Sequence, residues 1–100
     1  MLDNSLLQSV ATQLMGPDAV VVEGEMLPVA RVGGGRLKTV RFKMNGRDVQ
    51  AIEQNPQKPS RWGQLAKGGH RVVQFKDIET NRYLAVAVDG EIHAYGTGRD

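Results

Sequence analysis

The stretch RLKTVRFKMNGRDVQAIEQ, residues 36–54, restricts the fold of this chain more than any other segment. Asn45-Gly46 is a favoured pair for a two-residue type I′ turn, because both positions of that turn need a positive φ angle. Apolar and polar residues alternate on both sides of the pair, which is typical of a hairpin with one buried face. The turn predicts pairs on a core face, Phe42 with Val49 and Val40 with Ala51, and on a polar face, Arg41 with Gln50, Lys43 with Asp48 and Thr39 with Ile52.

A second hairpin is predicted at Asp89-Gly90, which carries the same turn signal. We expect strands over 70–76, 82–88 and 91–95, joined as a meander, and one or two short strands over 19–32, with Pro28 at an edge or bulge. The last turn places Leu84, Val86 and Val88 on one side with Glu91, His93 and Tyr95, and Ala85 and Ala87 on the other with Ile92 and Ala94. This pattern leaves the inward face of the hairpin open.

Two helices are predicted outside the strands. Residues 5–15 carry an apolar stripe at helical spacing, with Ser5 and Gln8 as a capping box and Gly16-Pro17 as the stop. The other side of this helix is polar and uncharged, so the helix either covers the protein's own core or is shared across an oligomer interface. Residues 60–67 form a short helix that Ser60 caps and Gly68-Gly69 ends, and Trp62 is expected to anchor it on the core.

These elements predict one domain over residues 1–100, since a chain of 100 residues has apolar surface for a single core. We expect a mainly β fold, a small antiparallel barrel or strongly bent sheet over 19–96, with the helix over 5–15 in front of it. The order of elements is similar to that of SH3-like and Sm-like barrels. This similarity carries no functional motif, so it implies a fold and no activity.

The charges of the chain are segregated along the sequence. Residues 1–30 hold four carboxylates and no basic residue, residues 31–76 hold eleven Lys or Arg against two carboxylates, and residues 77–100 hold five carboxylates against two Arg. The central segment therefore has a net charge of +9. Either opposite charges meet when the segments pack, or the basic residues gather on one face that attracts anions. The candidate anion-binding residues are Arg36, Lys38, Arg41, Lys43, Arg61, Lys67 and Arg71.

The sequence lacks the motifs of the common catalytic and metal sites. His70 and His93 stand without cysteine and without an H-x-x-x-H spacing. The segment DIETN resembles the start of a calcium loop, but Arg82 occupies its glycine position and Val88 its bidentate acid position. The segment GGGRLKT has no glycine before Lys38 and leads into a strand, unlike a phosphate loop. We therefore predict a non-enzymatic protein without a metal or cofactor.

The remaining composition bears on location and partners. There is no cysteine, no basic n-region at the N-terminus and no apolar run long enough to span a membrane, so we expect a soluble, cytoplasmic protein that does not bind membranes. The leading hypothesis is contact of the central basic face with nucleic acid phosphates. The alternative is a protein-interaction module that binds an acidic partner or adds a strand at a sheet edge. A homodimer through the N-terminal helix is a further expectation.

Overall fold

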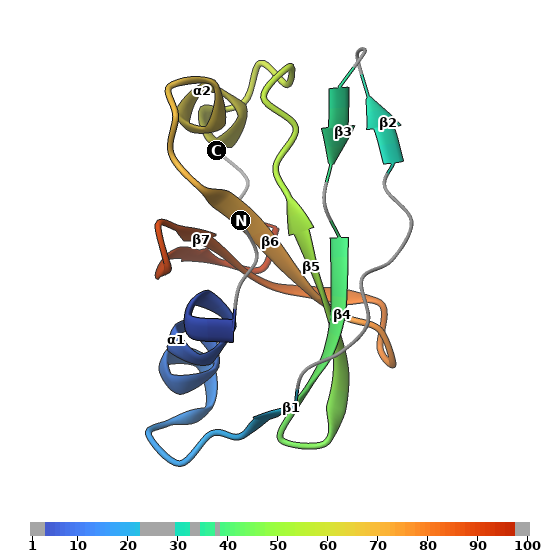
Figure 1. Ribbon diagram of the computed structural model, residues 1–100, viewed down its shortest axis with the longest axis vertical. Coiled ribbons are helices and arrows are strands. Elements are labelled where there is room, and N and C mark those ends of the chain that lie inside the picture. Colours follow the sequence, from blue (N-terminus) through green and yellow to red (C-terminus); the bar gives the residue numbers. More distant parts are fainter. Residues whose placement is uncertain (1–3, 23–29, 33–34, 38, 98–100) are drawn as a thin grey trace.

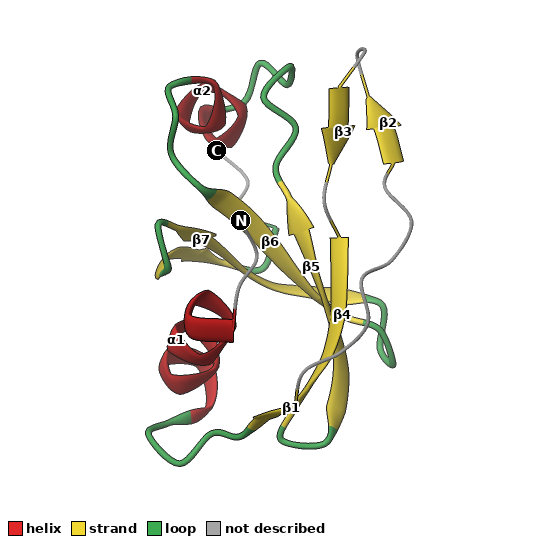
Figure 2. Cartoon of the chain, in the orientation of Figure 1, coloured by secondary structure: helices red, strands yellow, loops and turns green. Residues whose placement is uncertain are grey.

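The computed structural model describes residues 4–22, 30–32, 35–37 and 39–97 (Figure 1). Six antiparallel strands form one sheet in the order β1-β4-β5-β6-β7-β8, and β2 and β3 form a separate two-stranded sheet. The strands are β1 (Val21–Val22), β2 (Ala30–Val32), β3 (Gly35–Leu37), β4 (Thr39–Met44), β5 (Arg47–Glu53), β6 (Val72–Asp77), β7 (Arg82–Val88) and β8 (Glu91–Tyr95), and the helices are α1 (Asn4–Met15) and α2 (Arg61–Lys67). The predicted mainly β class is confirmed (Figure 2).

Both predicted hairpins are confirmed. All five pairs predicted between β4 and β5 are present in the register of the structure. The φ angles are 50° and 80° at Asn45-Gly46 and 53° and 88° at Asp89-Gly90, the positive values that a type I′ turn needs. The strand expected at Pro28 falls within residues 23–29, which lie outside the described residues.

The sheet is buried on both faces where β6 and β7 cross its centre. Val73 and Ala87 belong to a core that includes α1, whereas their neighbours Val72 and Val86 belong to a second cluster that includes Trp62 of α2. Successive side chains of a strand point to opposite faces of a sheet. The two helices therefore cover opposite faces, which are named here the α1 face and the α2 face.

The α1 face holds the larger core. Leu7 and Val10 of α1 are buried, and they belong to one cluster with Phe42 of β4 and Phe75 of β6. The two phenylalanine rings meet edge to face, with centroids 6.2 Å apart and an interplanar angle of 88°. This arrangement is favourable for aromatic pairs, so the core is well packed despite having few aromatic residues.

The α2 face is anchored by Trp62, as the sequence predicts. The Oγ atom of Ser60 accepts a hydrogen bond from the Gly63 N–H at 3.2 Å, and Gly69 has a φ of 97° after the helix. Trp62 is 4% exposed and packs with Val72, Val86 and Val88. A helix of seven residues is unstable alone in water, so burial of this indole holds α2 in place.

Two expectations about the sheet need revision. The described strands do not close a barrel, since β1 and β8 are the two edges of the sheet, so the barrel is not confirmed and the SH3-like order stays a prediction. The expectation that Ala94 shares a side with Ala87 is wrong. Ala87 pairs with Ile92 but Val86 pairs with Ala94, because His93 is an extra residue at an irregularity in the β7–β8 ladder.

The helix α1 differs from its prediction at the N-terminus. It begins at Asn4, so Ser5 lies inside the first turn and not at the N-cap. The side chain of Gln8 reaches the next segment, where its Nε2 donates a hydrogen bond to the Ala19 carbonyl at 2.9 Å. Gly16 ends the helix as expected, with a φ of 101° and its N–H bonded to the Thr12 carbonyl.

The polar side of α1 bonds the β7–β8 hairpin of the same chain, at the turn residue Gly90 and at Ile92 of the edge strand β8. The Nε2 of Gln13 donates to the Gly90 carbonyl, and its Oε1 accepts from the Ile92 N–H, both at 2.8 Å. Ser9 donates to the same Gly90 carbonyl at 3.0 Å. An amide that both donates and accepts in this way imitates the backbone of a neighbouring strand. The uncharged side of α1, on which the expected homodimer was based, thus forms hydrogen bonds within its own chain. The homodimer stays a prediction.

Candidate functional site

A row of four side chains crosses the sheet on the α2 face. The strand registers align Arg41 of β4 with Gln50 of β5, Gln50 with Lys76 of β6, and Lys76 with Tyr83 of β7. Lys76 lies two residues from Gln74, which pairs with Val86 of the α2 face, so the row lies on this face. Arg41 is exposed and the other three side chains are partly exposed. We name these four residues the cationic row.

Lys76 and Tyr83 contact one another within the cationic row. The Lys76 Nζ lies 5.5 Å from the centroid of the Tyr83 ring, within the range of a cation–π interaction. This contact holds the ammonium group over an aromatic face without neutralising it. The row therefore presents two positive charges, one amide and one aromatic ring.

Lys43 adds a third cation beside the row, and this cation is paired. It lies two residues from Arg41 on β4, and its Nζ is 3.2 Å from the Asp48 Oδ1. The lysine side chain is 52% exposed, so the pair contributes only about 0–1 kcal/mol to stability. Arg41 and Lys43 thus lie close together on β4, and Asp48 offsets part of their positive charge.

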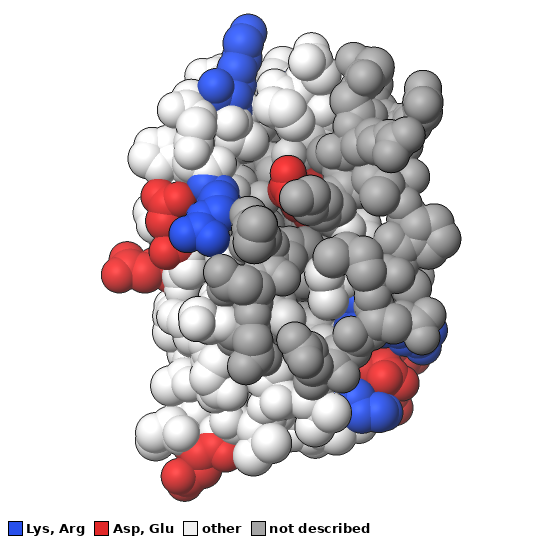
Figure 3. All heavy atoms as spheres, in the orientation of Figure 1, with Lys and Arg blue, Asp and Glu red and all other residues white. Residues whose placement is uncertain are grey.

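The other predicted residues lie elsewhere. Arg61 and Lys67 occupy the two ends of α2, where Arg61 stacks 4.6 Å from the Trp62 ring centroid. Arg71 comes just before β6 and two residues before Val73, so it falls on the α1 face, opposite to the cationic row. Only the backbone of Arg36 is described, in β3, and Lys38 lies outside the described residues. On the side of the molecule seen in Figure 3, Lys and Arg occupy separate places, and acidic side chains adjoin several of them.

Arg47 and Asp77 form an ion pair on the α1 face, in which the Asp77 side chain is buried and the Arg47 side chain is exposed. Arg47 donates from Nε to the Asp77 Oδ2 at 2.9 Å, and a second guanidinium nitrogen is 2.7 Å from that oxygen. Burial is the largest influence on the pKa of Asp77 and raises it, but the hydrogen bonds from Arg47 and from the backbone N–H groups of Thr80 and Glu79, with the positive charge of Arg47, together outweigh it. The pKa of Asp77 therefore lies below its ordinary value, and the carboxylate organises the β6–β7 turn.

His70 and Asp89 form a second pair that joins the central and C-terminal segments. The His70 Nδ1 lies 2.8 Å from the Asp89 Oδ2, and the Arg71 N–H donates to the other oxygen at 2.9 Å. These two contacts, the His70 bond first, lower the pKa of the Asp89 carboxyl. Part of the charge segregation therefore serves packing, because the Arg47–Asp77 pair brings opposite charges of residues 31–76 and 77–100 together.

Sequence reasoning missed Lys76, Gln50 and Tyr83 as members of one site. The alternation in VVQFK does place Lys76 on the outward side of its strand. The alternation gives no information on which strand lies next to β6 or in which register, so the link to Arg41 needs the tertiary structure.

Comparison of the chain with protein-family models, with curated proteins and with solved structures finds no match. Among the described residues, no helix has the length and apolar character needed to cross a membrane.

Proposed function

We propose that this domain binds nucleic acid through the cationic row, with phosphate groups as its main contacts. The alignment of Arg41, Gln50 and Lys76 on three adjacent strands is the observation that carries the proposal. Adjacent strands lie about 4.8 Å apart, so the backbones beneath Arg41 and Lys76 are separated by about 10 Å. Two long cationic side chains at this separation can contact neighbouring phosphates of one strand, with Gln50 between them.

Tyr83 supports the same function at the end of the row. Its ring is partly exposed on the sheet surface, next to the Lys76 ammonium. Aromatic rings on an open sheet stack on nucleic acid bases without strong sequence preference. The proposal therefore favours single strands over duplexes and phosphate contact over base reading. Lys43 joins the surface when a phosphate displaces Asp48.

The test is fluorescence anisotropy with labelled oligonucleotides, single- and double-stranded and of mixed sequence, at several salt concentrations. The variant Arg41→Glu with Lys76→Glu should abolish most binding at low salt. With the milder variant Arg41→Gln and Lys76→Gln, the slope of log K against log salt should fall by about 1.5, since two phosphate contacts are lost.

The matched control is Lys58→Glu with Lys67→Glu, which makes the same change in net charge on exposed residues of the 54–60 loop and of α2. This control should retain binding to within a few-fold. If the wild-type protein binds no oligonucleotide at low salt, or if the control and the row variant lose affinity equally, the proposal is wrong.

Strand addition is a second candidate, and the edge at β4 favours it. Among the described residues, β1 pairs only with Lys43 and Met44 on this side of β4. The rest of β4 is the place where an extended segment of an acidic partner would add a strand. A protein partner that stays bound in stoichiometric amount after nuclease treatment, and is lost when Arg41 is replaced by Pro, would favour this candidate over nucleic acid.

A further inference from the structure

Three side chains form a partly exposed surface between the cationic row and α2. Ile52 of β5 pairs with Gln74 of β6, and Gln50 lies two residues before Ile52 on the same face of the sheet. All three are partly exposed, whereas the residues that flank them along the same line across the sheet, Thr39 and Val86, are buried. We name Gln50, Ile52 and Gln74 the amide patch.

The two carboxamides of the amide patch have no partner in the part of the chain that the structure describes. No hydrogen bond to another described residue involves the side chain of Gln50 or Gln74. The two residues are diagonal neighbours on adjacent antiparallel strands, so their backbones lie about 7–8 Å apart. Each carboxamide holds an acceptor oxygen beside an NH₂ donor. The patch therefore offers two donor–acceptor pairs next to the apolar side chain of Ile52.

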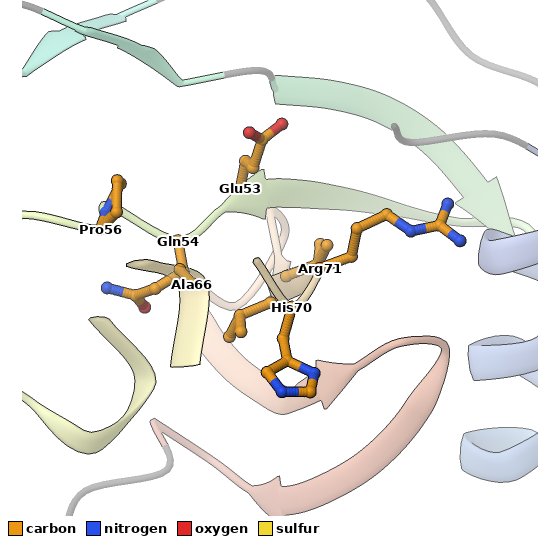
Figure 4. Close-up of a pocket in the computed structure, with 8 residues that line it drawn as sticks. Glu53, Gln54, Pro56, Ala66, His70 and Arg71 are labelled. Carbon is orange, nitrogen blue, oxygen red and sulfur yellow. The ribbon is translucent and has the colours of Figure 1, made fainter. Parts of the chain in front are cut away.

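A third glutamine, Gln54, marks where this surface ends. It lies two residues after Ile52, and Figure 4 shows it among the residues that line a small cavity with Ala66 of α2. Gln54 is 6% exposed, and its Nε2 donates a hydrogen bond to the Asn55 carbonyl at 3.2 Å. A ligand on the sheet surface therefore reaches the amide patch but not Gln54.

The place of the amide patch suits the base of a nucleotide whose phosphates contact the cationic row. Gln50 belongs to both, and it lies between Arg41 and Lys76. On the other side of the row, Lys43 and Asp48 form an ion pair, and a base placed there would remove water from these charges at a cost. The side toward α2 instead offers an apolar side chain for the face of a base and two amides for its edges.

Adenine is the base that matches two carboxamides. A glutamine amide pairs with a base edge that carries a donor beside an acceptor, as in its bidentate contact with adenine N6 and N7. Adenine presents a second such pair, N6 with N1, on its Watson–Crick edge, because its amino group has two hydrogens. Cytosine and thymine present such a pair on the Watson–Crick edge alone, and the Hoogsteen edge of guanine presents two acceptors. On these two edges, only adenine can pair with two glutamines at once.

We propose that the amide patch recognises one adenine of a bound single strand, with Gln50 and Gln74 on its two edges and Ile52 against its face. This inference rests on the proposed function, because phosphate contacts along the cationic row bring the strand to the sheet. The cationic row supplies most of the affinity, and the amide patch adds a preference for adenine at one position.

The test is fluorescence anisotropy with three labelled single-stranded DNA decamers at one low salt concentration. Their sequences alternate C with A, C with T, and T with G, so none forms Watson–Crick pairs with itself. The C–A decamer should bind about fivefold more tightly than the C–T decamer, the lower limit for one bidentate contact. Replacing each adenine by 7-deazaadenine removes N7 and should reduce this preference to about twofold, because one of the two contacts is lost.

The variant Gln50→Met with Gln74→Met keeps the length of both side chains and removes both amides. Its preference for the C–A decamer should disappear, and its affinity for the C–T decamer should change little. The matched control is Gln57→Met with Gln64→Met, which makes the same two changes on exposed residues of the 54–60 loop and of α2. The control should keep the preference, and Trp62 fluorescence shows whether each variant is folded.

The outcomes separate this proposal from the proposed function. If no decamer binds the wild type, both are wrong. If all three decamers bind equally, or the T–G decamer binds most tightly, the proposed function stands and the adenine site is wrong. An unchanged preference with 7-deazaadenine, or its equal loss in the control variant, would also overturn the adenine site. The 7-deazaadenine measurement uses the wild-type protein, so it decides even where the double variant does not fold.

Discussion

Gly63 lies inside α2 at the closest approach between this helix and the preceding loop. A methyl group at this position would overlap the carbonyl oxygen of Lys58 and lie 2.8 Å from its carbonyl carbon. Both atoms belong to backbone, so neither can move aside as a flexible side chain would. Gly63→Ala should therefore push α2 away from the loop by on the order of 1 Å.

The cost of this shift can be weighed against the gain in helix propensity. Alanine stabilises a helix interior by about 1 kcal/mol relative to glycine. Overpacking of a tight contact costs about 1–3 kcal/mol, and a gap of about 1 Å beneath Trp62 would lose up to about half of its dispersion contacts there. The expected net result is a loss of about 1–2 kcal/mol in the free energy of unfolding, opposite in sign to the propensity effect alone.

Urea denaturation followed by tryptophan fluorescence measures this loss directly, because Trp62 is the sole tryptophan and lies on α2. The midpoint should fall by about 1 M for a chain of this size. Gly68→Ala is the matched control, since a methyl group there meets nothing closer than 3.5 Å, and its midpoint should change little. A Gly63→Ala variant as stable as the wild type would refute the idea that this contact positions α2.

Three further outcomes are expected from the packing and the charges. Gln13→Leu removes the bonds to the Gly90 carbonyl and to the Ile92 N–H of β8, so the unfolding free energy should fall by about 0.5–1.5 kcal/mol and light scattering over a dilution series should detect association through the uncovered edge. Trp62→Ala should cost about 3–5 kcal/mol and remove the α2 signal from circular dichroism; a smaller loss would mean that α2 has another anchor. The folded pKa of Asp77 is depressed, so its contribution is complete above the unfolded pKa and is lost as pH falls through about 4 and below. Asp77→Asn should therefore be less stable than the wild type at pH 7 and approach it in urea melts near pH 3, whereas parallel curves would contradict this.

The charge segregation of the sequence has two consequences in the structure. The pairs Arg47–Asp77 and His70–Asp89 join the basic central segment to the acidic C-terminal segment. Arg41 and Lys76 instead lie on the open part of the α2 face, where no ion pair within the described residues involves either side chain. The first set contributes to packing, and the second set is the basis of the proposed function.

Local chemistry accounts for the parts of the fold that the sequence predicts well. The positive φ angles at Asn45-Gly46 and Asp89-Gly90, the Ser60 cap and the glycine stop of α2 each depend on a few adjacent residues. The burial of Trp62 has the same origin, because a short helix requires an apolar anchor. Strand alternation likewise assigned the two faces of the β4–β5 hairpin, since a two-residue turn sets its register.

The way in which distant segments meet depends on the tertiary structure. The alternation of residues does not indicate that β6 pairs with β5, so the row from Arg41 to Tyr83 could not be predicted from the sequence. The extra residue at His93 changes the pairing of β8, and both faces of β7 are buried because a helix covers each. Turns, caps and the faces of single hairpins can be predicted from the sequence because their energies are local. Strand order, register across the sheet and the surface shared by three strands depend on packing between residues far apart in the chain, which no local pattern encodes.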